Sequence, residues 1–334
     1  PLERGGLAFR AGRPKDDEAL EALRSTSRFQ VRWGDWDPVE RLKDYDLDGV
    51  DASVLFPNFS GFTGNPLAMV KDLDVRLECI KAYNDWLVDE FCGVDPKRLI
   101  ALPLIPAWDR DLAIAEAIRS VKKGHKGVMF GAALDVFGFT PNWDKYWDPF
   151  YATVQDLGVP LTFHQISATM DRAVFHDPKI DIPDAIKTAT IVAHIHSLIM
   201  PTTELIMSGM LERFPLLKVF YAEGGVSWLP YTLNQLDFFW PIHGRSDKNE
   251  LRMLPSEYYR RQCSAGFWSD PITPDVLEWV GEDNALWEGD YLHTIATYPQ
   301  SQKVIDQSLK KIHDEDLRYK IVAGNAVKLF QLDK

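Results

Sequence analysis

Short apolar segments alternate with longer segments of helical periodicity along most of the chain. Seven of the short segments are almost entirely apolar, which is typical of strands buried on both faces of a parallel sheet. They span residues 49–58, 99–106, 127–134, 160–167, 217–225, 261–267 and 284–291. The pattern therefore predicts seven strands of one parallel sheet.

Helical spacing of apolar residues fills the stretches between these strands. It extends over residues 66–91, 111–124, 147–158, about 184–212, 227–240 and 274–281, and further helices are expected after residue 291. Gly124 and Gly158 mark the predicted ends of two of these helices. Strands that alternate with helices in this way predict a parallel α/β architecture.

The first part of the chain differs from the rest. Residues 1–45 are polar, rich in Gly and charge, and only weakly periodic, so we predict an irregular N-terminal segment over 1–45 and a single domain over 46–334. Seven strands are one short of a (β/α)8 TIM-like barrel, which is the fold we predict. Because no segment of 1–45 is apolar enough for a buried strand, we expect strand 1 to lie upstream of Pro1, missing from the chain as given.

Composition and motifs exclude several classes of protein. No strand is followed by G-x-G-x-x-G, which argues against a Rossmann fold. The 334 residues carry 37 basic and 49 acidic side chains, so a basic surface for nucleic acid is not expected. No run of 18 apolar residues predicts a membrane span.

The three cysteines, Cys79, Cys92 and Cys263, match neither a zinc motif nor a disulfide framework. With no secretory signal visible, we predict reduced thiols and a cytoplasmic protein. The expected partners are a small-molecule substrate and further copies of the chain, in a dimer or larger homo-oligomer.

Polar residues end three of the predicted strands. His164, Glu223 and Asp290 each follow an apolar strand interior, and barrel enzymes place their chemistry at the carboxyl ends of strands. Taken alone, His164 also has a structural interpretation as a core or rim histidine, and Glu223 as a helix cap. Together they favour a metal site, because a cation is the simplest way to offset several buried carboxylates.

Other histidines give weaker signals. His293 lies three residues past Asp290 and could act as an acid, a base or a partner of that carboxylate, or could simply bond a backbone carbonyl. His194 and His196 form H-x-H within a segment of helical periodicity, where the two side chains would point apart. Because neither a G-x-S-x-G motif nor a Cys–His pattern is present, metal-assisted chemistry is favoured over a side-chain nucleophile.

Several ordered blocks of the chain resemble a known family. "GVPLTFHQ", "MLERFPLLKVFYAEGGVSWLPYTLNQLD" and "VGEDNALWEGDYLHTIATYPQS" are similar to conserved blocks of the amidohydrolase-2 family, the branch of the amidohydrolase superfamily that includes the aminocarboxymuconate-semialdehyde decarboxylase-like enzymes. The resemblance runs from about residue 36 to the end. It implies the same barrel and a divalent metal ion, zinc, iron or manganese.

The resemblance also implies roles for individual residues. His164 matches the family's strand-5 metal ligand, and Asp290 matches the strand-8 carboxylate that binds metal and exchanges protons. Glu223 takes the position where the decarboxylases carry a histidine. This exchange makes the site richer in oxygen donors, which favours iron or manganese over zinc.

Three departures from the family pattern accompany these matches. Gly289 and Leu292 replace the usual Ser and Pro near His293, and the D-x-H or H-x-H motif of strand 1 is not found in this chain. The function we predict is a metal-dependent hydrolase or non-oxidative decarboxylase that acts on an apolar or aromatic carboxylic acid, with His164, Glu223 and Asp290 on the metal and Asp290 and His293 in catalysis. The alternatives are a non-haem iron oxygenase on the same barrel and a degenerate barrel that binds a ligand without turnover.

Overall fold

A computed structural model describes residues 32–57, 70–165, 189, 192, 196–244, 251–293 and 296–333. It contains seven strands, each of which lies inside one of the seven predicted segments. They are β1 (Ser53–Leu55), β2 (Leu99–Ala101), β3 (Val128–Phe130), β4 (Leu161–His164), β5 (Val219–Ala222), β6 (Cys263–Phe267) and β7 (Ala285–Trp287).

All paired strands are parallel and neighbours follow chain order, with β1 beside β2 and β3 to β7 in one sheet. A backbone hydrogen bond from Lys126 N to Ala101 O, 3.2 Å long, joins the end of β2 to the start of β3. Among the described residues, no strand lies between β7 and β1. An eighth strand would take that place, and its position upstream of Pro1 stays a prediction.

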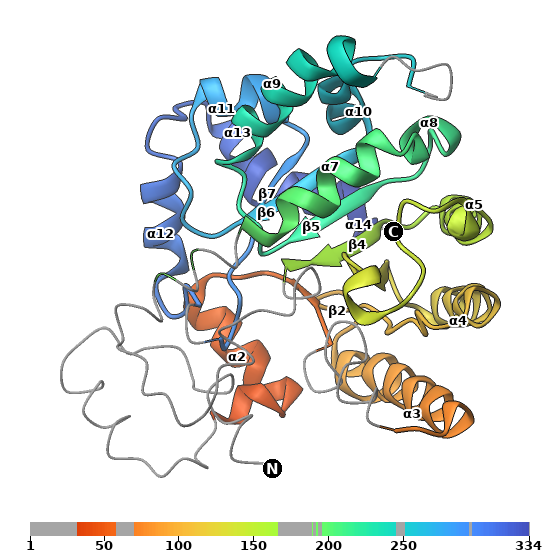
Figure 1. The fold of residues 1–334 in the computed structure, drawn as a ribbon. Helices are drawn as coiled ribbons and strands as arrows, with labels where there is room; N and C mark the ends of the chain where they lie inside the picture. The colour runs from red at the N-terminus through yellow and green to blue at the C-terminus, as the bar shows by residue number, and fades with distance from the viewer. Residues whose placement is uncertain are drawn as a thin grey trace.

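Helices surround these strands (Figure 1). The α-helices are α2 (Pro38–Asp48), α3 (Leu73–Trp86), α4 (Arg110–Lys123), α5 (Asp148–Leu157), α7 (Ile199–Met207), α8 (Met210–Arg213), α9 (Leu229–Phe239), α10 (Pro255–Gln262), α11 (Pro274–Val280), α12 (Ser301–Ser308), α13 (Glu315–Tyr319) and α14 (Asn325–Phe330). Short 3-10 or π segments are η2 (Trp33–Asp35), η4 (Leu87–Phe91), η5 (Cys92–Val94), η6 (Asp135–Phe137), η7 (Lys145–Trp147), η9 (His196–Leu198), η10 (Trp240–Gly244) and η11 (Lys320–Gly324).

Helix α2 corrects one expectation. The prediction of irregular structure over 1–45 is wrong for residues 38–45, which belong to this helix. Its apolar periodicity is weak, but its end signals are strong. The Asp37 side chain accepts hydrogen bonds from the backbone N–H groups of Val39 and Glu40, Pro38 occupies the first turn, and Gly49 ends the helix with φ 70°. The domain boundary at residue 46 stays a prediction.

The long helix expected over 184–212 is divided in the structure. Gly209, with φ 75°, separates α7 from α8, and most residues before His196 lie outside the described part of the chain. The predicted ends at Gly124 and Gly158 are confirmed, because these glycines follow α4 and α5 directly. Helix α10, just before β6, is an element that the apolar pattern did not predict.

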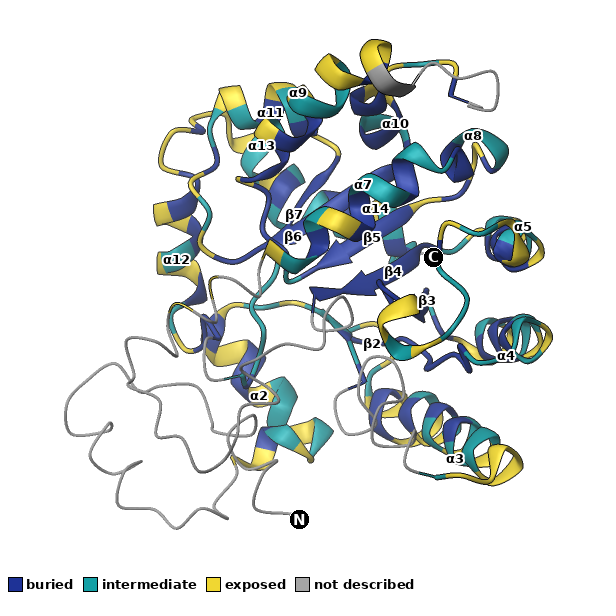
Figure 2. Ribbon diagram, in the orientation of Figure 1, coloured by how far each residue is buried: buried dark blue, intermediate teal, exposed yellow. Residues whose placement is uncertain are grey.

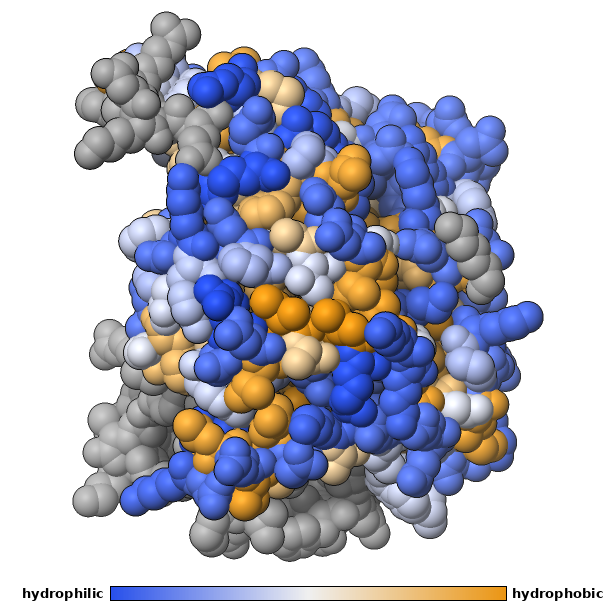
Figure 3. All heavy atoms as spheres, turned by 90° about the vertical axis from the view of Figure 1, so that its right-hand side faces the viewer, coloured by the Kyte–Doolittle hydropathy of each residue, from blue (hydrophilic) through white to orange (hydrophobic). Residues whose placement is uncertain are grey.

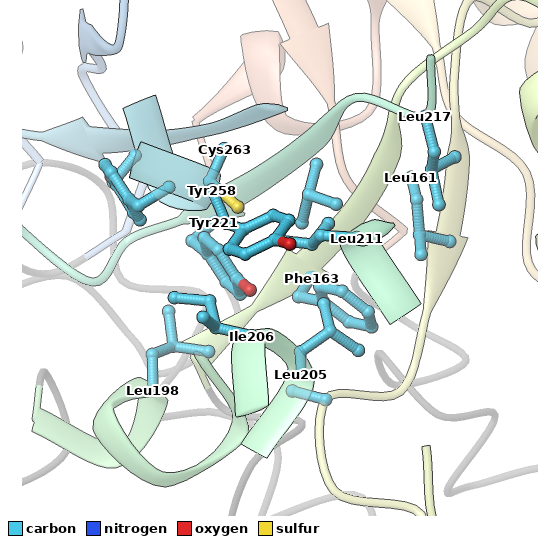
Figure 4. Packing of buried hydrophobic residues seen from close by; sticks show 14 of the residues in the cluster. Leu161, Phe163, Leu198, Leu205, Ile206, Leu211, Leu217, Tyr221, Tyr258 and Cys263 are labelled. Atoms are coloured by element: carbon cyan, nitrogen blue, oxygen red, sulfur yellow. The ribbon is translucent and has the colours of Figure 1, made fainter. Parts of the chain in front are cut away.

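The strands bury both faces, as their apolar composition predicts. On β4 and β5, Leu161, Phe163, Val219 and Tyr221 belong to the hydrophobic cluster between the sheet and the helices. Figure 4 shows Phe163 and Tyr221 of this cluster beside residues of α7, α8 and α10. The alternate residues Phe220 and Ala222 belong to a second cluster. It also contains Leu102, which directly follows β2, Met129 of β3 and Leu286 of β7. This cluster fills the inside of the curved sheet, so the direction of each strand residue follows from the period of two.

Burial follows this arrangement through the whole molecule. Figure 2 shows strands β2 to β6 buried and helices that are buried mainly on the side facing the strands, whereas Ser53, Val54 and Trp287 of β1 and β7 are half-buried. The face that carries α3, α4 and α5 is largely hydrophilic, with apolar side chains gathered toward its middle (Figure 3). Within the described residues, the helices are too short or too polar to cross a membrane.

Candidate metal centre

The three predicted ligands lie at the carboxyl ends of three strands. His164 is the last residue of β4, Glu223 directly follows β5, and Asp290 lies shortly after β7. His164 is paired in register with Ala222, so the next residue, Glu223, is brought beside it. The site therefore forms where parallel α/β proteins place their chemistry.

His164 faces the inside of the sheet. It is buried, with 2% of its surface exposed, and it lies two residues after Thr162 on the same side of β4. The ring of Phe56 packs edge-on against the imidazole at 5.4 Å between centroids. The His164 Nε2 atom lies 2.9 Å from the Glu223 Oε1 atom, so the ring is held between an aromatic side chain and a carboxylate.

Glu223 reaches His164 only because its backbone leaves the extended conformation. Ala222 points into the sheet interior, so an extended Glu223 would point outward toward the helices. Its φ of 57° is left-handed, which reverses that direction. Left-handed backbone at a non-glycine residue costs on the order of 1–3 kcal/mol and is concentrated at functional sites.

Asp290 has the same unusual backbone, with φ 52°. Its Oδ2 atom lies 2.9 Å from the His293 Nδ1 atom, and its carboxyl group forms a hydrogen bond with Glu223. Of the interpretations open for His293, contact with the Asp290 carboxylate is the one that the structure shows. The four residues thus form a continuous series of contacts from His164 through Glu223 and Asp290 to His293.

The carboxylates of this series have strongly shifted pKa values. Burial raises the pKa of Asp290 well above its usual range, and the negative charge of Glu223 raises it further. Burial would also raise the pKa of Glu223, but the charge of His164 and hydrogen bonds from His164 and Asp290 lower it to about 2. In the absence of a cation, a proton shared by this pair therefore resides on Asp290 rather than on Glu223, and Asp290 donates the hydrogen bond between them.

A further carboxylate, Glu288, lies in the same place and was not among the predicted site residues. Its Oε1 atom accepts a hydrogen bond of 2.7 Å from the backbone N–H of Glu223. Burial, and then the charge of Glu223, raises the pKa of Glu288 well above its usual range. The only sequence signal was the presence of a charged residue directly after an apolar strand.

His164 and His293 are the basic side chains paired with this group of acids. In the described part of the chain, neither Lys nor Arg forms an ion pair with Glu223, Glu288 or Asp290. As these residues stand, no group of three or more His, Cys, Asp or Glu side chains within the described ranges is arranged to hold a metal ion. The donor atoms contact one another instead, in the pairs described above. An imidazole and two carboxylates without a Lys or Arg partner in the described part of the chain are nevertheless the donor set that suits a divalent cation.

Hydrogen bonds connect the loop that carries Asp290 to helix α2. The hydroxyl groups of Tyr291 and Tyr298 both donate to the carboxylate of Asp44, the latter over 3.0 Å, and Arg32 donates to it as well. Burial would raise the pKa of Asp44, but these three hydrogen-bond donors lower it. A helix that the apolar pattern did not predict therefore helps to position the predicted catalytic loop.

The remaining histidine pair gives no support for a ligand role. His194 lies outside the described residues. His196 is exposed in η9, and its Nδ1 atom lies 2.9 Å from the carbonyl oxygen of Val192, one helical turn earlier.

Comparison with known proteins identifies the class to which this fold and site belong. A model of the amidohydrolase family matches residues 19–332. The chain therefore belongs to the amidohydrolase family.

The individual relatives have low sequence identity to this chain but match it over most of its length. The chain is 23% identical over 310 residues to the 2-amino-3-carboxymuconate-6-semialdehyde decarboxylase of Dictyostelium discoideum, which covers 89% of this chain and 77% of that protein. It is similar in structure to 5-carboxyvanillate decarboxylase from Sphingomonas paucimobilis, with a TM-score of 0.66, 20% identity, and coverage of 87% of this chain and 82% of that chain.

A third relative was solved with metal. A dihydroxybenzoic acid decarboxylase from Polaromonas sp. JS666, with bound manganese and the inhibitor 2-nitroresorcinol, has a TM-score of 0.65 and 21% identity, and covers 96% of this chain and 91% of that chain. Family membership confirms the predicted (β/α)8 class and the predicted kind of enzyme, a metal-dependent hydrolase or decarboxylase of the amidohydrolase superfamily. The roles of individual site residues stay predictions.

Proposed function

We propose that the protein is a non-oxidative decarboxylase of an aromatic carboxylic acid, with one divalent metal ion bound by His164, Glu223 and Asp290. One observation carries this proposal. A histidine and two carboxylates meet at the carboxyl ends of β4, β5 and β7, with 2.9 Å between His164 Nε2 and Glu223 Oε1 and no Lys or Arg paired with the acids among the described residues. Such a concentration of buried negative charge is best offset by a cation.

The choice of decarboxylation over hydrolysis rests on the relatives. The named relatives are decarboxylases of carboxylated aromatic or muconate compounds, and one of them was solved with manganese. Two oxygen donors and one nitrogen donor favour manganese or iron over zinc on chemical grounds. We therefore expect manganese or iron rather than zinc in the active enzyme.

Each residue then has a defined part in the reaction. When bound, the metal would supply positive charge that holds the substrate carboxylate and stabilises negative charge that develops on the ring. Asp290 delivers the proton that replaces the departing carbon dioxide on the substrate carbon. His293, whose Nδ1 atom lies 2.9 Å from Asp290 Oδ2, orients that carboxyl group and exchanges the proton with it.

The experiment is to measure metal content together with carbon dioxide release. Purified protein loaded with manganese, iron or zinc is offered a panel of hydroxylated aromatic acids, including 5-carboxyvanillate and 2,6-dihydroxybenzoate, and the matching aromatic amides and esters. We expect metal-dependent release of carbon dioxide from at least one acid. Hydrolysis of the amides or esters without carbon dioxide release would show a hydrolase instead, and metal-dependent oxygen consumption would show an oxygenase. Metal binding without turnover of any panel member would favour a non-catalytic barrel.

We also propose that the enzyme works in the cytoplasm as a dimer or larger homo-oligomer. The three cysteines are free thiols in the structure, two of them buried, which suits a reducing compartment. Size-exclusion chromatography with light scattering tests the oligomer, and a monomer at micromolar concentration would contradict it.

A further inference from the structure

Glu288 continues the inward-facing side of β7. Leu286 belongs to the hydrophobic cluster inside the sheet, and Trp287 packs against the hydrophobic cluster between the sheet and the helices. Because side chains alternate along a strand, Glu288 points inward like Leu286. There its Oε1 atom accepts the 2.7 Å hydrogen bond from the backbone N–H of Glu223. The carboxylate therefore binds the backbone of a predicted metal ligand rather than its side chain.

Gly266 leaves the space that this carboxylate occupies. It lies on the neighbouring strand β6, between Ala265 and Phe267, which both face the helices. A Cβ atom on Gly266 would lie 2.3 Å from Glu288 Oε2 and 2.4 Å from its Cδ atom. Any side chain at residue 266 would therefore displace the Glu288 carboxylate.

The turn after Glu223 is held from its other side by Asp270. Its Oδ1 atom accepts hydrogen bonds of 2.9 Å from the backbone N–H groups of both Val226 and Ser227. Two carboxylates, one at each end of the turn, thus accept hydrogen bonds from its backbone N–H groups. Asp270 holds the end that leads into α9, and Glu288 holds the residue with left-handed φ.

These hydrogen bonds explain why the Glu223 side chain points toward His164. An extended residue after Ala222 would point away from His164, and the left-handed backbone that corrects this is unfavourable by itself. A hydrogen bond from the Glu223 N–H to a fixed acceptor on β7 stabilises that conformation. It fixes the peptide plane that precedes the Glu223 Cα atom.

We propose that Glu288 is a positioning residue, which holds the Glu223 backbone so that the Glu223 carboxylate meets His164, in a niche opened by Gly266. This inference deepens the proposed function, because it concerns how the same metal site is built. It assigns Glu288 no contact with the metal. Residue 288 needs a side chain long enough to place a hydrogen-bond acceptor beside the Glu223 N–H, and it does not need a negative charge.

The first test compares two substitutions at this residue by calorimetric titration of metal-free protein with Mn²⁺. Glu288→Gln keeps the Oε1 acceptor and should bind Mn²⁺ within about threefold of the unaltered protein. Glu288→Ala removes the acceptor and should weaken binding by roughly tenfold or more, the scale known for residues that orient metal ligands. Equal losses in both variants would show that Glu288 acts through its charge or as a ligand, and would overturn the proposal, as would Mn²⁺ binding by Glu288→Ala that matches the unaltered protein.

The second test uses Gly266 in a double-mutant cycle. Gly266→Ala should weaken Mn²⁺ binding by roughly tenfold when Glu288 is present, because the new methyl group displaces the carboxylate. In the Glu288→Ala background the same change should cost less than about twofold, because the niche is then free. Additive losses in the cycle would contradict a shared niche.

A metal-free crystal structure of Glu288→Ala separates this inference from the proposed function. We expect the Glu223 carboxylate to leave its contact with His164 Nε2, whether or not the protein binds metal. Retention of that 2.9 Å contact and of left-handed φ at Glu223 would overturn the positioning role. Failure of the unaltered protein to bind any divalent metal would overturn the proposed function and leave this structural result intact.

Discussion

Two clusters of buried polar residues in this protein differ in how their charges are balanced. Between α3 and α4, the Glu116 side chain is 1% exposed and forms an ion pair with Arg119 at 2.8 Å. The same carboxylate accepts hydrogen bonds from Asn84 and Ser120. At the carboxyl ends of the strands, Glu223, Glu288 and Asp290 crowd together with histidines but with no Lys or Arg partner among the described residues.

The difference separates a structural cluster from a functional one. The first cluster contains its own cation and normal helical backbone, so it is complete as the chain folds. The second cluster contains two residues with left-handed φ and two carboxylates whose pKa values are raised by burial and by the charge of Glu223. A protein retains such an unfavourable group where a ligand completes it. Substitutions in the two clusters should therefore change different measurements.

The largest expected effect is loss of stability in the structural cluster. Glu116→Ala should lower the free energy of unfolding by about 2–6 kcal/mol, because the buried Asn84 amide and Ser120 hydroxyl each lose their acceptor at a cost of about 1–3 kcal/mol, while Arg119 keeps its ion pair with Asp85. Urea denaturation measures this loss, and Mn²⁺ affinity should stay unchanged. The control is Glu78→Ala on α3, whose side chain is 69% exposed in its pair with Lys81 and should cost under about 1 kcal/mol. Equal stabilities of the two variants would remove the contrast.

The structural cluster should also govern acid stability through His125. Burial lowers the pKa of this histidine from 6.5 to about 4, against the raising effects of the Asn84 carbonyl and of Glu116 and Asp85, with Arg119 adding to the fall. Because the unfolded chain takes up the proton first, the stability contribution is complete above pH 6.5 and is lost as the pH falls toward 4.

A shift of this size corresponds to about 3 kcal/mol. The measurement is urea denaturation of the unaltered protein and of His125→Gln between about pH 7 and pH 4. Over this range the unaltered protein should lose about 3 kcal/mol more than the variant. Parallel pH profiles for the two proteins would show that His125 does not titrate in this way.

In the functional cluster, the largest expected effect is on turnover. Asp290→Asn should reduce activity by about 10²-fold or more, because the variant can neither accept nor deliver a proton. Asparagine tolerates left-handed φ well, so the backbone and the far-UV circular dichroism should stay the same. His293→Ala should lose less, since this residue acts through Asp290. Near-normal turnover by Asp290→Asn would show that the carboxyl group is not needed for catalysis.

The next effect is on metal binding. His164→Ala should weaken Mn²⁺ binding by at least roughly tenfold, as measured by calorimetry. The matched control is His125→Ala, the same substitution at another histidine that is 2% exposed, which should cost stability but leave metal affinity unchanged. Unchanged stoichiometry and affinity in His164→Ala would make His164 a structural residue like His125.

The smallest expected effect is on the stability of metal-free protein with Glu223→Gln. Removal of the Glu223 charge relieves the repulsion that raises the pKa values of Asp290 and Glu288 but also removes the ion pair with His164. The melting temperature should therefore change little, while Mn²⁺ affinity falls. A helix cap would behave in the opposite way and lose on the order of 1 kcal/mol with full metal binding. Thermal unfolding with and without Mn²⁺ distinguishes the two results.

Much of this architecture could be predicted from the sequence, because the signals were local. Strands buried on both faces must be apolar over several consecutive residues, and all seven predicted segments contain a strand. His164, Glu223 and Asp290 could be selected because each interrupts an apolar segment at its carboxyl end. Helix α2 could not be predicted from periodicity, although Asp37, Pro38 and Gly49 mark its ends.

What only the tertiary structure decided is how the site residues are directed. Glu288 and Glu223 are 65 residues apart, so no local pattern could pair a strand-end carboxylate with a backbone N–H on another strand. The left-handed backbone of Glu223 and Asp290 is likewise invisible in the sequence, since non-glycine residues adopt it only where surrounding contacts impose it. The sequence by itself determined the order of strands and which polar residues lie at their ends, because strand formation and alternation depend on neighbours along the chain. The contacts among those residues, and the unbalanced charge that calls for a cation, depend on the packing of strands that are distant in sequence.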